Sequence, residues 1–258
     1  MKKRSSRPNR YSKSPAVSRG WKKLFAVGCS HGHLADKEAI ETVLGFQERW
    51  KPDTTIHLGD FVDLSALMGM GKAADEIADN LTIDFQKGME FLNRLRPQTV
   101  FLGNHEDRVW KLMDHRNELM SYAAFRIADD LEAGLRKFGA EMVPYDIDTG
   151  WRKLGDTQFG HGYMCNESAI RDHAEFIGKC VIAHLHRPGI ARARRHGGAT
   201  GMCVGTLANI PMMSYAKTRK ARAMWNHGFV YGEYCEGKNP EAVLWLVEKG
   251  KNGWRLPL

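Results

Sequence analysis

Five short apolar runs in this sequence are each followed at once by polar residues of the types that bind metal ions. The run Thr55–Leu58 breaks at Gly59 and is followed by Asp60 and Asp63, two carboxylates three residues apart. A buried strand that ends there would place both carboxylates at its carboxyl end, where open α/β sheets hold their ligands. Taken alone, this segment is better explained as a turn whose aspartate caps a helix.

The recurrence of the arrangement changes that interpretation. The other four clusters are Cys29-Ser30-His31, Gly103-Asn104-His105-Glu106, Gly160-His161-Gly162 and Ala183-His184-Leu185-His186. Together the five clusters supply imidazoles, carboxylates and an amide, which is a ligand set for a pair of transition metals. Because parallel strands share one direction, clusters that follow such strands are expected at the same edge of a sheet.

Apolar periodicity predicts alternating strands and helices in the first half of the chain and short strands in the second. Strands are expected at Leu24–Gly28, Thr54–Leu58, Thr99–Leu102 and Cys180–Ala183, and helices at Asp36–Trp50, Ala73–Leu95 and about Ser168–Ile177. The long helical pattern from Glu106 to Phe138 predicts two helices that cover the sheet. Runs near 190–195, 202–207, 228–235 and 242–247 are expected to form a second, mostly antiparallel sheet.

Positive charge is concentrated in two segments of the chain. Residues 1–23 carry nine Lys or Arg and no acidic residue, and residues 181–222 carry eight and again no acidic residue, whereas residues 24–180 have a net charge of −9. Such basic segments are typical of proteins that bind a polyanion, of which nucleic acid is the first candidate. A solvated, disordered leader explains the first segment equally well.

Composition predicts one folded domain in the cytoplasm. The sequence has no apolar run long enough to span a membrane and no apolar segment of the length that a signal peptide needs. Its five cysteines are odd in number and lack C-x-x-C spacing, which argues against a disulfide framework or a zinc ribbon. We therefore expect a disordered basic tail at residues 1–20, a folded domain at residues 21–258, and no membrane partner.

In their order and spacing, the five clusters resemble the pattern of the calcineurin-like metallophosphoesterase family, bacterial and phage type. The family pattern D-x-H, G-D-x-x-D, G-N-H-E, H and G-H-x-H is matched here by Cys29-x-His31, Gly59-Asp60-x-x-Asp63, Gly103-Asn104-His105-Glu106, His161-Gly162 and Ala183-His184-x-His186. Five dispersed matches in family order are far more specific than any one of them. The resemblance implies an α/β fold, the four-layer α/β/β/α sandwich of two packed mixed sheets flanked by helices.

The resemblance also implies a role for each matched residue. Asp60 would bridge two divalent metal ions, because a carboxylate has two oxygens; the remaining ligands would be Cys29, His31 and His186 at one ion and Asn104, His161 and His184 at the other. His105 would stabilise or protonate the leaving oxygen, and Asp63 would hold the imidazole of His105 by a hydrogen bond. Arg108 and Arg187 are candidates for contacting the substrate phosphate, although a surface or packing role is at least as common for such residues.

The activity that the resemblance implies is hydrolysis of a phosphomonoester or phosphodiester by a hydroxide that the two metals hold. Leu64 stands where protein Ser/Thr phosphatases carry arginine, which argues against phosphoproteins as the substrate class. The basic segment at residues 187–222 and the basic tail favour nucleotides or nucleic acid instead. The alternative is a catalytically weakened protein that keeps the fold as a nucleic-acid-binding scaffold.

Two residues depart from the family pattern. Cys29 replaces the first aspartate, and its thiolate would favour zinc or ferrous iron over magnesium or manganese. For the pair of ions as a whole, Mn, Zn and Fe all stay open. An alternative register makes His31 and His33 the ligands; we prefer Cys29, because Gly28 then directly precedes the ligand at the end of the strand. Ala183 replaces a glycine, which should fit if its backbone angle is ordinary.

Overall fold

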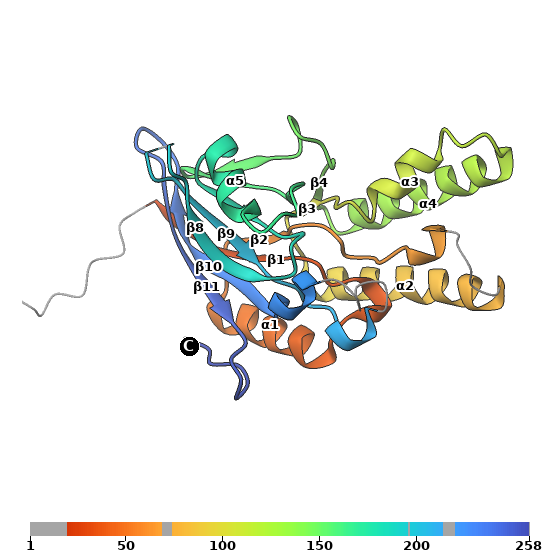
Figure 1. Ribbon diagram of the computed structural model, residues 1–258, viewed down its shortest axis with the longest axis horizontal. Coiled ribbons are helices and arrows are strands. Elements are labelled where there is room, and N and C mark those ends of the chain that lie inside the picture. Colours follow the sequence, from red (N-terminus) through yellow and green to blue (C-terminus); the bar gives the residue numbers. More distant parts are fainter. Residues whose placement is uncertain (1–19, 69–73, 196, 214–219, 258) are drawn as a thin grey trace, which may run out of the picture.

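The strands of this protein form two sheets whose inner faces pack against each other (Figure 1). The computed structural model describes residues 20–68, 74–195, 197–213 and 220–257. Side chains of both sheets meet in one core, to which Leu24 contributes from the first sheet and Val181 from the second. Helices α1 (Lys37–Trp50) and α2 (Ala74–Leu95) cover the outer face of the first sheet, and α5 (Ala169–Ile177) covers that of the second. The predicted four-layer α/β/β/α sandwich is confirmed.

The first sheet has the strand order β11-β10-β1-β2-β3-β4. Its strands are β1 (Trp21–Val27), β2 (Thr54–His57), β3 (Thr99–Phe101), β4 (Glu141–Val143), β10 (Gly228–Cys235) and β11 (Glu241–Glu248). Strands β1 to β4 are parallel, so their carboxyl ends lie at one edge. Along β1, Leu24 and Ala26 face the core between the sheets, whereas Phe25 and Val27 pack toward α1, because successive side chains alternate. Burial on both faces explains why the second half of this strand, Leu24–Val27, is an unbroken apolar run in the sequence.

The second sheet has the strand order β5-β6-β7-β9-β8. Its strands are β5 (Arg152–Leu154), β6 (Thr157–Phe159), β7 (Cys180–Ile182), β8 (Pro188–Arg192) and β9 (Thr200–Val204). The β6–β7 and β7–β9 pairs are parallel, and the β5–β6 and β8–β9 pairs are antiparallel, so the sheet is mixed rather than mostly antiparallel as predicted.

Two predicted strands belong to a different sheet from the one we expected. The runs at 228–235 and 242–247 do form strands, but β10 pairs antiparallel with β1 and β11 pairs antiparallel with β10, which extends the first sheet. Phe229 of β10 packs on the α1 side and Val230 in the core between the sheets, so this strand needs cover on both faces. An apolar run predicts a strand, but it contains no information on which of two sheets offers the matching edge.

The helices begin and end close to their predicted positions. Helix α1 starts after Asp36, whose side chain accepts a hydrogen bond from the backbone N–H of Ala39 at 2.9 Å, and the 106–138 segment divides into α3 (Asp107–Leu112) and α4 (Glu118–Lys137) as predicted. Short 3₁₀ turns occur at η1 (Gly32–Leu34), η2 (Ser65–Met68), η3 (Ile210–Met212) and η5 (Lys220–Met224). No helix in the described ranges is both long and apolar enough to cross a lipid bilayer.

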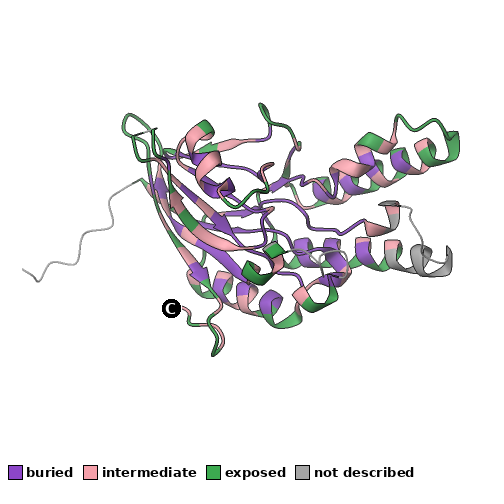
Figure 2. Cartoon of the chain, viewed as in Figure 1, coloured by how far each residue is buried: buried purple, intermediate pink, exposed green. Residues whose placement is uncertain are grey.

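Helices α2 and α4 extend away from the sheets on the same side of the molecule (Figure 1). The loop that follows β2 packs between them, because Phe61, Val62 and Leu64 share one apolar cluster with Leu92 of α2 and Leu131 of α4. Figure 2 shows buried positions along both helices in this part of the molecule. The two helices therefore fix the position of the segment that carries Asp60 and Asp63.

A buried carboxylate on α2 holds the same loop by hydrogen bonds. Asp84 accepts from the backbone N–H groups of Asp63, at 3.0 Å, and of Leu64, at 2.7 Å. The backbone of Gly32 also comes close: a Cβ there would lie 2.0 Å from Asp84 Oδ1, and Gly32 has a φ of +48°. Side-chain and backbone groups from three separate segments thus meet at one aspartate.

We expect Asp84→Ala to lower the free energy of unfolding by about 1–3 kcal/mol, because the buried N–H groups of Asp63 and Leu64 lose their acceptor. Urea unfolding followed by circular dichroism measures the change. The matched control is Asp129→Ala on α4, where the carboxylate is exposed and only a pair with Arg126 at 3.5 Å is lost. Equal effects of the two substitutions would contradict the structural role of Asp84.

Candidate metal centre

All five polar clusters lie where a strand ends, and they meet between the two sheets. Three follow β1, β2 and β3 of the first sheet, and two follow β6 and β7 of the second. Backbone hydrogen bonds join the first two loops, from the N–H of Cys29 to the carbonyl of Gly59 and from the N–H of His31 to the carbonyl of Asp60, both at 2.9 Å. The clusters after β1, β2 and β3 lie at one edge of the first sheet, as expected. The second sheet brings the other two clusters to the same place.

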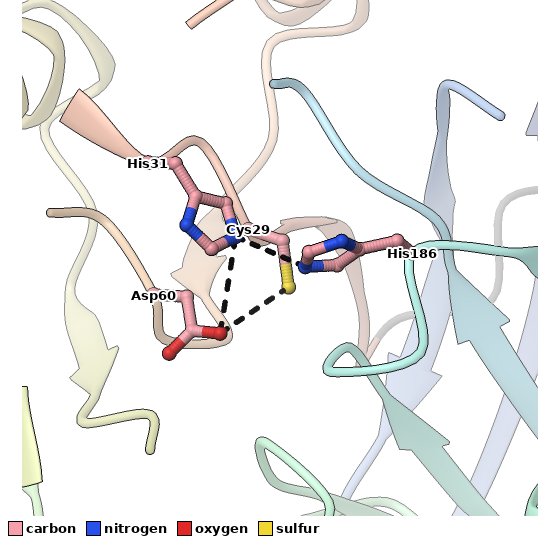
Figure 3. Close-up of side chains that lie close together, drawn as sticks. All are labelled: Cys29, His31, Asp60 and His186. Atoms are coloured by element: carbon pink, nitrogen blue, oxygen red, sulfur yellow. Dashed lines mark hydrogen bonds and ion pairs between the residues drawn. The ribbon is translucent and has the colours of Figure 1, made fainter. Parts of the chain in front are cut away.

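Four buried side chains form a first group of potential ligands: Cys29, His31, Asp60 and His186. One potential ligand atom from each lies within 4.8 Å of all the others. The Nε2 atoms of His31 and His186 are 2.9 Å apart, and Asp60 Oδ2 is 3.9 Å from His31 Nε2 and 4.0 Å from Cys29 Sγ. Figure 3 shows these four side chains pointing toward one another.

A second group shares Asp60 with the first. Potential ligand atoms of Asp60, His161 and His184 again lie within 4.8 Å of one another. Asp60 Oδ2 is 3.3 Å from His161 Nε2, and Asn104 Oδ1 is 3.2 Å from His161 Nε2 and 2.8 Å from His184 Nδ1. The structure thus brings together all seven residues that the sequence suggested as metal ligands, in two groups that meet at Asp60.

The chemistry of the first group fits a cation. Asp63 Oδ1 lies 3.0 Å from His31 Nδ1, so that nitrogen carries the proton and Nε2 presents its lone pair to the group. His186 Nδ1 is buried and has no hydrogen-bond partner among the described residues. Imidazole nitrogens, a carboxylate and a thiol aimed at one point are the donor set of a transition metal, and the bond from His31 to a carboxylate is the usual way to fix a ligating ring.

The burial of the centre sets the protonation of its side chains in the absence of a cation. Burial lowers the pKa of His184 to about 3 and that of His186 well below its usual value. Burial, followed by the charge of Asp60, raises the pKa of Cys29 well above its usual value. Burial acts to raise the pKa of Asp60 as well, but the neighbouring His161 and His105 lower it overall. Neutral imidazoles suit a metal directly, whereas Cys29 has to lose its proton before it can bind one.

His105 and Asp63 lie beside the first group. His105 Nδ1 is 2.5 Å from the backbone carbonyl oxygen of Asp63 and 3.4 Å from its Oδ1, and His105 Nε2 is 4.0 Å from Asp60 Oδ2. Burial opposes the protonation of His105, but Asp60 and Asp63 outweigh it and raise its pKa to about 9. Asp63 Oδ1 is closer to His31 than to His105, so this carboxylate contacts two imidazoles rather than one.

The two arginines proposed for substrate contact have different surroundings in the structure. Arg108 Nη1 donates to the backbone carbonyl of Asp63 at 3.0 Å and is 3.2 Å from His105 Nδ1, so it lies next to the centre. Arg187 Nη2 donates instead to the carbonyls of Asn166 and Glu167, at 2.8 and 2.7 Å, and thereby braces that loop.

His33, the alternative ligand, is outside both groups of potential ligands that meet at Asp60. Its Nδ1 lies 3.1 Å from Asp84 Oδ1, and its backbone N–H donates to the same oxygen at 3.3 Å. Within the described residues, no cluster of potential metal ligands includes His33. The geometry therefore favours the register in which Cys29 and His31 face the centre.

Several residues of the centre have left-handed backbone angles. Cys29, His31, Asp60, His184 and His186 have φ between 52° and 62°. Non-glycine residues rarely adopt such angles, and each costs about 1–3 kcal/mol that the surrounding contacts must outweigh. Ala183 has no positive φ, so the expectation that alanine fits in place of glycine there is confirmed.

Sequence reasoning assigned no role to Glu106. Its buried carboxylate accepts from the backbone N–H groups of Asp60, Val62 and Gly103, at 2.9, 3.1 and 2.7 Å. Burial and the charge of Asp60 raise the pKa of Glu106 to about 7. Glu106 thus joins the loops after β2 and β3. The sequence signal for Glu106 was its position next to His105. Asp84 was missed as well, and its signal was the presence of a carboxylate within the apolar stripe of α2.

Comparison with known proteins gives one family. The family model described as calcineurin-like phosphoesterase matches residues 22–203. The Gene 54 proteins of Mycobacterium phages D29 and L5 are each 26% identical to this chain over 232 residues, which cover 81% of this chain and 87% of the phage protein.

Solved structures also share similarity with this chain. An archaeal phosphodiesterase has a TM-score of 0.42 and 12% identity, covering 87% of this chain and 99% of that one. The Escherichia coli phosphoesterase Yfce has a TM-score of 0.36 and 17% identity, covering 82% and 87%. Vps29 of Chaetomium thermophilum has a TM-score of 0.38 and 9% identity, covering 88% and 96%.

We expect zinc or manganese to raise the thermal unfolding midpoint, because a ligand that binds only the folded state stabilises it, by about 2.7 kcal/mol at a concentration of 100 Kd. Differential scanning calorimetry with and without a chelator measures the shift. Asp60→Ala should reduce the shift, since both groups lose a shared ligand, whereas His115→Ala, at an exposed position, should retain it. A midpoint that no transition metal changes would contradict a metal centre.

Proposed function

Since the chain belongs to the calcineurin-like phosphoesterase family and is therefore a metal-dependent phosphoester hydrolase, we propose that it works with two divalent metal ions that share the carboxylate of Asp60. The observation that carries this proposal is the position of Asp60, which belongs to both groups of converging ligand atoms and whose Oδ2 lies 3.9 Å from His31 Nε2 and 3.3 Å from His161 Nε2. A carboxylate between two such groups is the arrangement expected of a bridging ligand, because pairs of catalytic metals lie about 3.5–4 Å apart.

We assign the ligands as two sets. Cys29, His31 and His186 bind one ion and Asn104, His161 and His184 the other, with Asp60 common to both. The convergence of these side chains on Asp60 supports the assignment. A thiolate suits zinc or ferrous iron best, and the second set, with nitrogen and oxygen donors only, is also compatible with manganese.

When bound, the ions supply Lewis acidity: they withdraw charge from the phosphate oxygens and make water more acidic. The residues of the chain orient the reaction around them. The Nδ1–H of His105 donates to the carbonyl of Asp63, which directs Nε2 toward Asp60 and toward the place where the ester would bind. A proton on Nε2 can then pass to the leaving oxygen. Arg108, fixed on the same carbonyl, adds positive charge beside the phosphate.

The substrate is a phosphomonoester or phosphodiester, and we propose nucleotides or nucleic acid as its class. The basic segment at 187–222 supports this, because a positive surface concentrates polyanions. Residues 196 and 214–219 of this segment, and residues 1–19 of the basic tail, lie outside the described residues. The contact between Arg187 and phosphate stays a prediction, as do the tail at 1–20, the single domain at 21–258 and the cytoplasmic location.

Hydrolysis of aryl phosphomonoesters and diesters, followed by chromophore release together with metal analysis, tests the proposal against a scaffold without turnover. We expect His105→Ala to keep both metals and to lose about 10²–10⁴ in rate, the range that general acid–base groups contribute. His115→Ala, at an exposed position, should change neither. Loss of metal in His105→Ala would show that His105 is a ligand, and no turnover by the metal-loaded wild type would overturn the proposal.

We expect Cys29→Ala to deplete one metal of the pair and to keep the other, because Asn104, His161 and His184 remain. Cys29→Asp should restore an oxygen ligand and shift the preferred activator toward manganese or magnesium, which bind hard oxygen donors better than sulfur. Metal content by mass spectrometry, and labelling of Cys29 by thiol reagents before and after chelation, measure both effects.

His33→Ala is the matched variant for the ligand register. It should keep both metals, because His33 contacts Asp84 instead of the converging groups. The opposite pattern, in which Cys29→Ala retains two metals and His33→Ala loses one, would establish the alternative register.

A further inference from the structure

A cavity of about 300 Å³ opens beside the metal centre. His161 lines it and also belongs to the second ligand group, so the cavity and the centre share a wall. The other sides come from α3, from the segment between β4 and β5, and from Tyr163 after β6. None of these residues was singled out from the sequence, apart from His161 and Gly162.

Three aromatic side chains dominate the walls: Tyr145, Trp151 and Tyr163. The ring of Tyr145 contacts His161 edge-on, with ring centroids 5.6 Å apart, and the rings of Trp151 and Tyr163 are 6.4 Å apart at an angle of 81°. We call this cavity, defined by Tyr145, Trp151, Tyr163, Asp107 and Lys111, the aromatic pocket.

Hydrogen bonds and close packing hold two of these rings in place. The indole N–H of Trp151 donates to the carbonyl of Ile147 at 2.9 Å, and a Cβ at Gly160 would lie 2.5 Å from the indole ring. The backbone N–H of Tyr163 donates to His173 Nε2 at 3.0 Å, and the two rings are 4.8 Å apart. The walls are therefore preorganised, which reduces the entropy lost when a ligand binds.

We propose that the aromatic pocket binds the nucleobase of a nucleotide ester whose phosphate lies at the metal centre; this inference rests on the proposed function and specifies its substrate. Aromatic side chains can stack on any of the bases, because every base has a flat π-face, and proteins commonly bind unpaired bases by such stacking. A volume of about 300 Å³ is at the lower end for ligand pockets and suits one base rather than a continuous strand.

Polar groups in the pocket favour a nucleobase over a plain phenyl ring. The ammonium of Lys111 pairs with Asp107 at 2.5 Å, and Asp146 lines the same cavity, so donors and acceptors lie next to the aromatic walls. A nucleobase carries hydrogen-bonding groups on its ring edge, which such residues can satisfy, whereas the phenyl ring of an aryl phosphate carries none.

The test measures binding without turnover. Three phosphonates that cannot be hydrolysed are titrated into the metal-loaded protein by calorimetry: the analogue of adenosine 5′-monophosphate with carbon in place of the ester oxygen, benzylphosphonate and methylphosphonate. We expect the nucleotide analogue to bind at least about tenfold more tightly than the other two. Tyr163→Ala should weaken the nucleotide analogue about tenfold, as expected for one lost stacking contact, and Tyr163→Phe should restore most of the loss.

The control is Tyr122→Ala on α4, where the tyrosine is 64% exposed and outside the pocket; its affinity should equal that of the wild type. Equal affinities for the nucleotide analogue and benzylphosphonate, or no effect of Tyr163→Ala, would overturn the inference. Tight nucleotide binding that Tyr163→Ala weakens, in a protein that hydrolyses no ester, would instead uphold the pocket and remove the proposed function.

Discussion

The carboxylate of Asp60 is a buried anion at the meeting point of two sheets, and the surrounding structure is arranged to hold it there. Burying a carboxylate is costly unless hydrogen bonds or opposite charges compensate. Asp60 Oδ1 accepts from the backbone N–H of His105 at 3.0 Å, and Asp60 Oδ2 faces the imidazoles of His31 and His161. A divalent cation on each side would neutralise this charge, which is the physical reason that the proposed centre suits two ions.

Holding that anion requires backbone conformations that the local sequence does not favour. Residues such as Cys29, Asp60 and His184 have left-handed angles at positions where glycine would be easier. Glu106 and Asp84 help to hold the loop after β2 in this conformation, because each buried side chain accepts hydrogen bonds from backbone N–H groups of that loop. Apolar contacts from α2 and α4 fix the same loop from outside. The metal centre is therefore supported by the packing of helices that contribute no proposed ligand.

The two sheets contribute different parts of the same centre. The first supplies Asp60 and the residues around it, whereas the second supplies the imidazoles of His161, His184 and His186 from the ends of β6 and β7. The sheets approach closely at this point, since a Cβ on Gly28 would lie 2.8 Å from Ala183 Cβ. The segments before β5 and after β6 supply the three aromatic rings of the aromatic pocket, and α3 supplies Asp107 and Lys111, so the second sheet also influences what can lie beside the centre.

The sequence alone determined where strands end and which residues of metal-binding types follow them, because both are recorded in short local patterns. Apolar periodicity located α1, α2 and α5 within one residue, and the resemblance of the five clusters to the family pattern implied the seven proposed ligands. Tertiary structure alone decided that β10 and β11 extend the first sheet, that Asp63 contacts His31 as well as His105, and that Tyr145, Trp151 and Tyr163 form one pocket. Each of these features depends on contacts between residues far apart in the chain, and a sequence pattern read locally contains no record of such contacts.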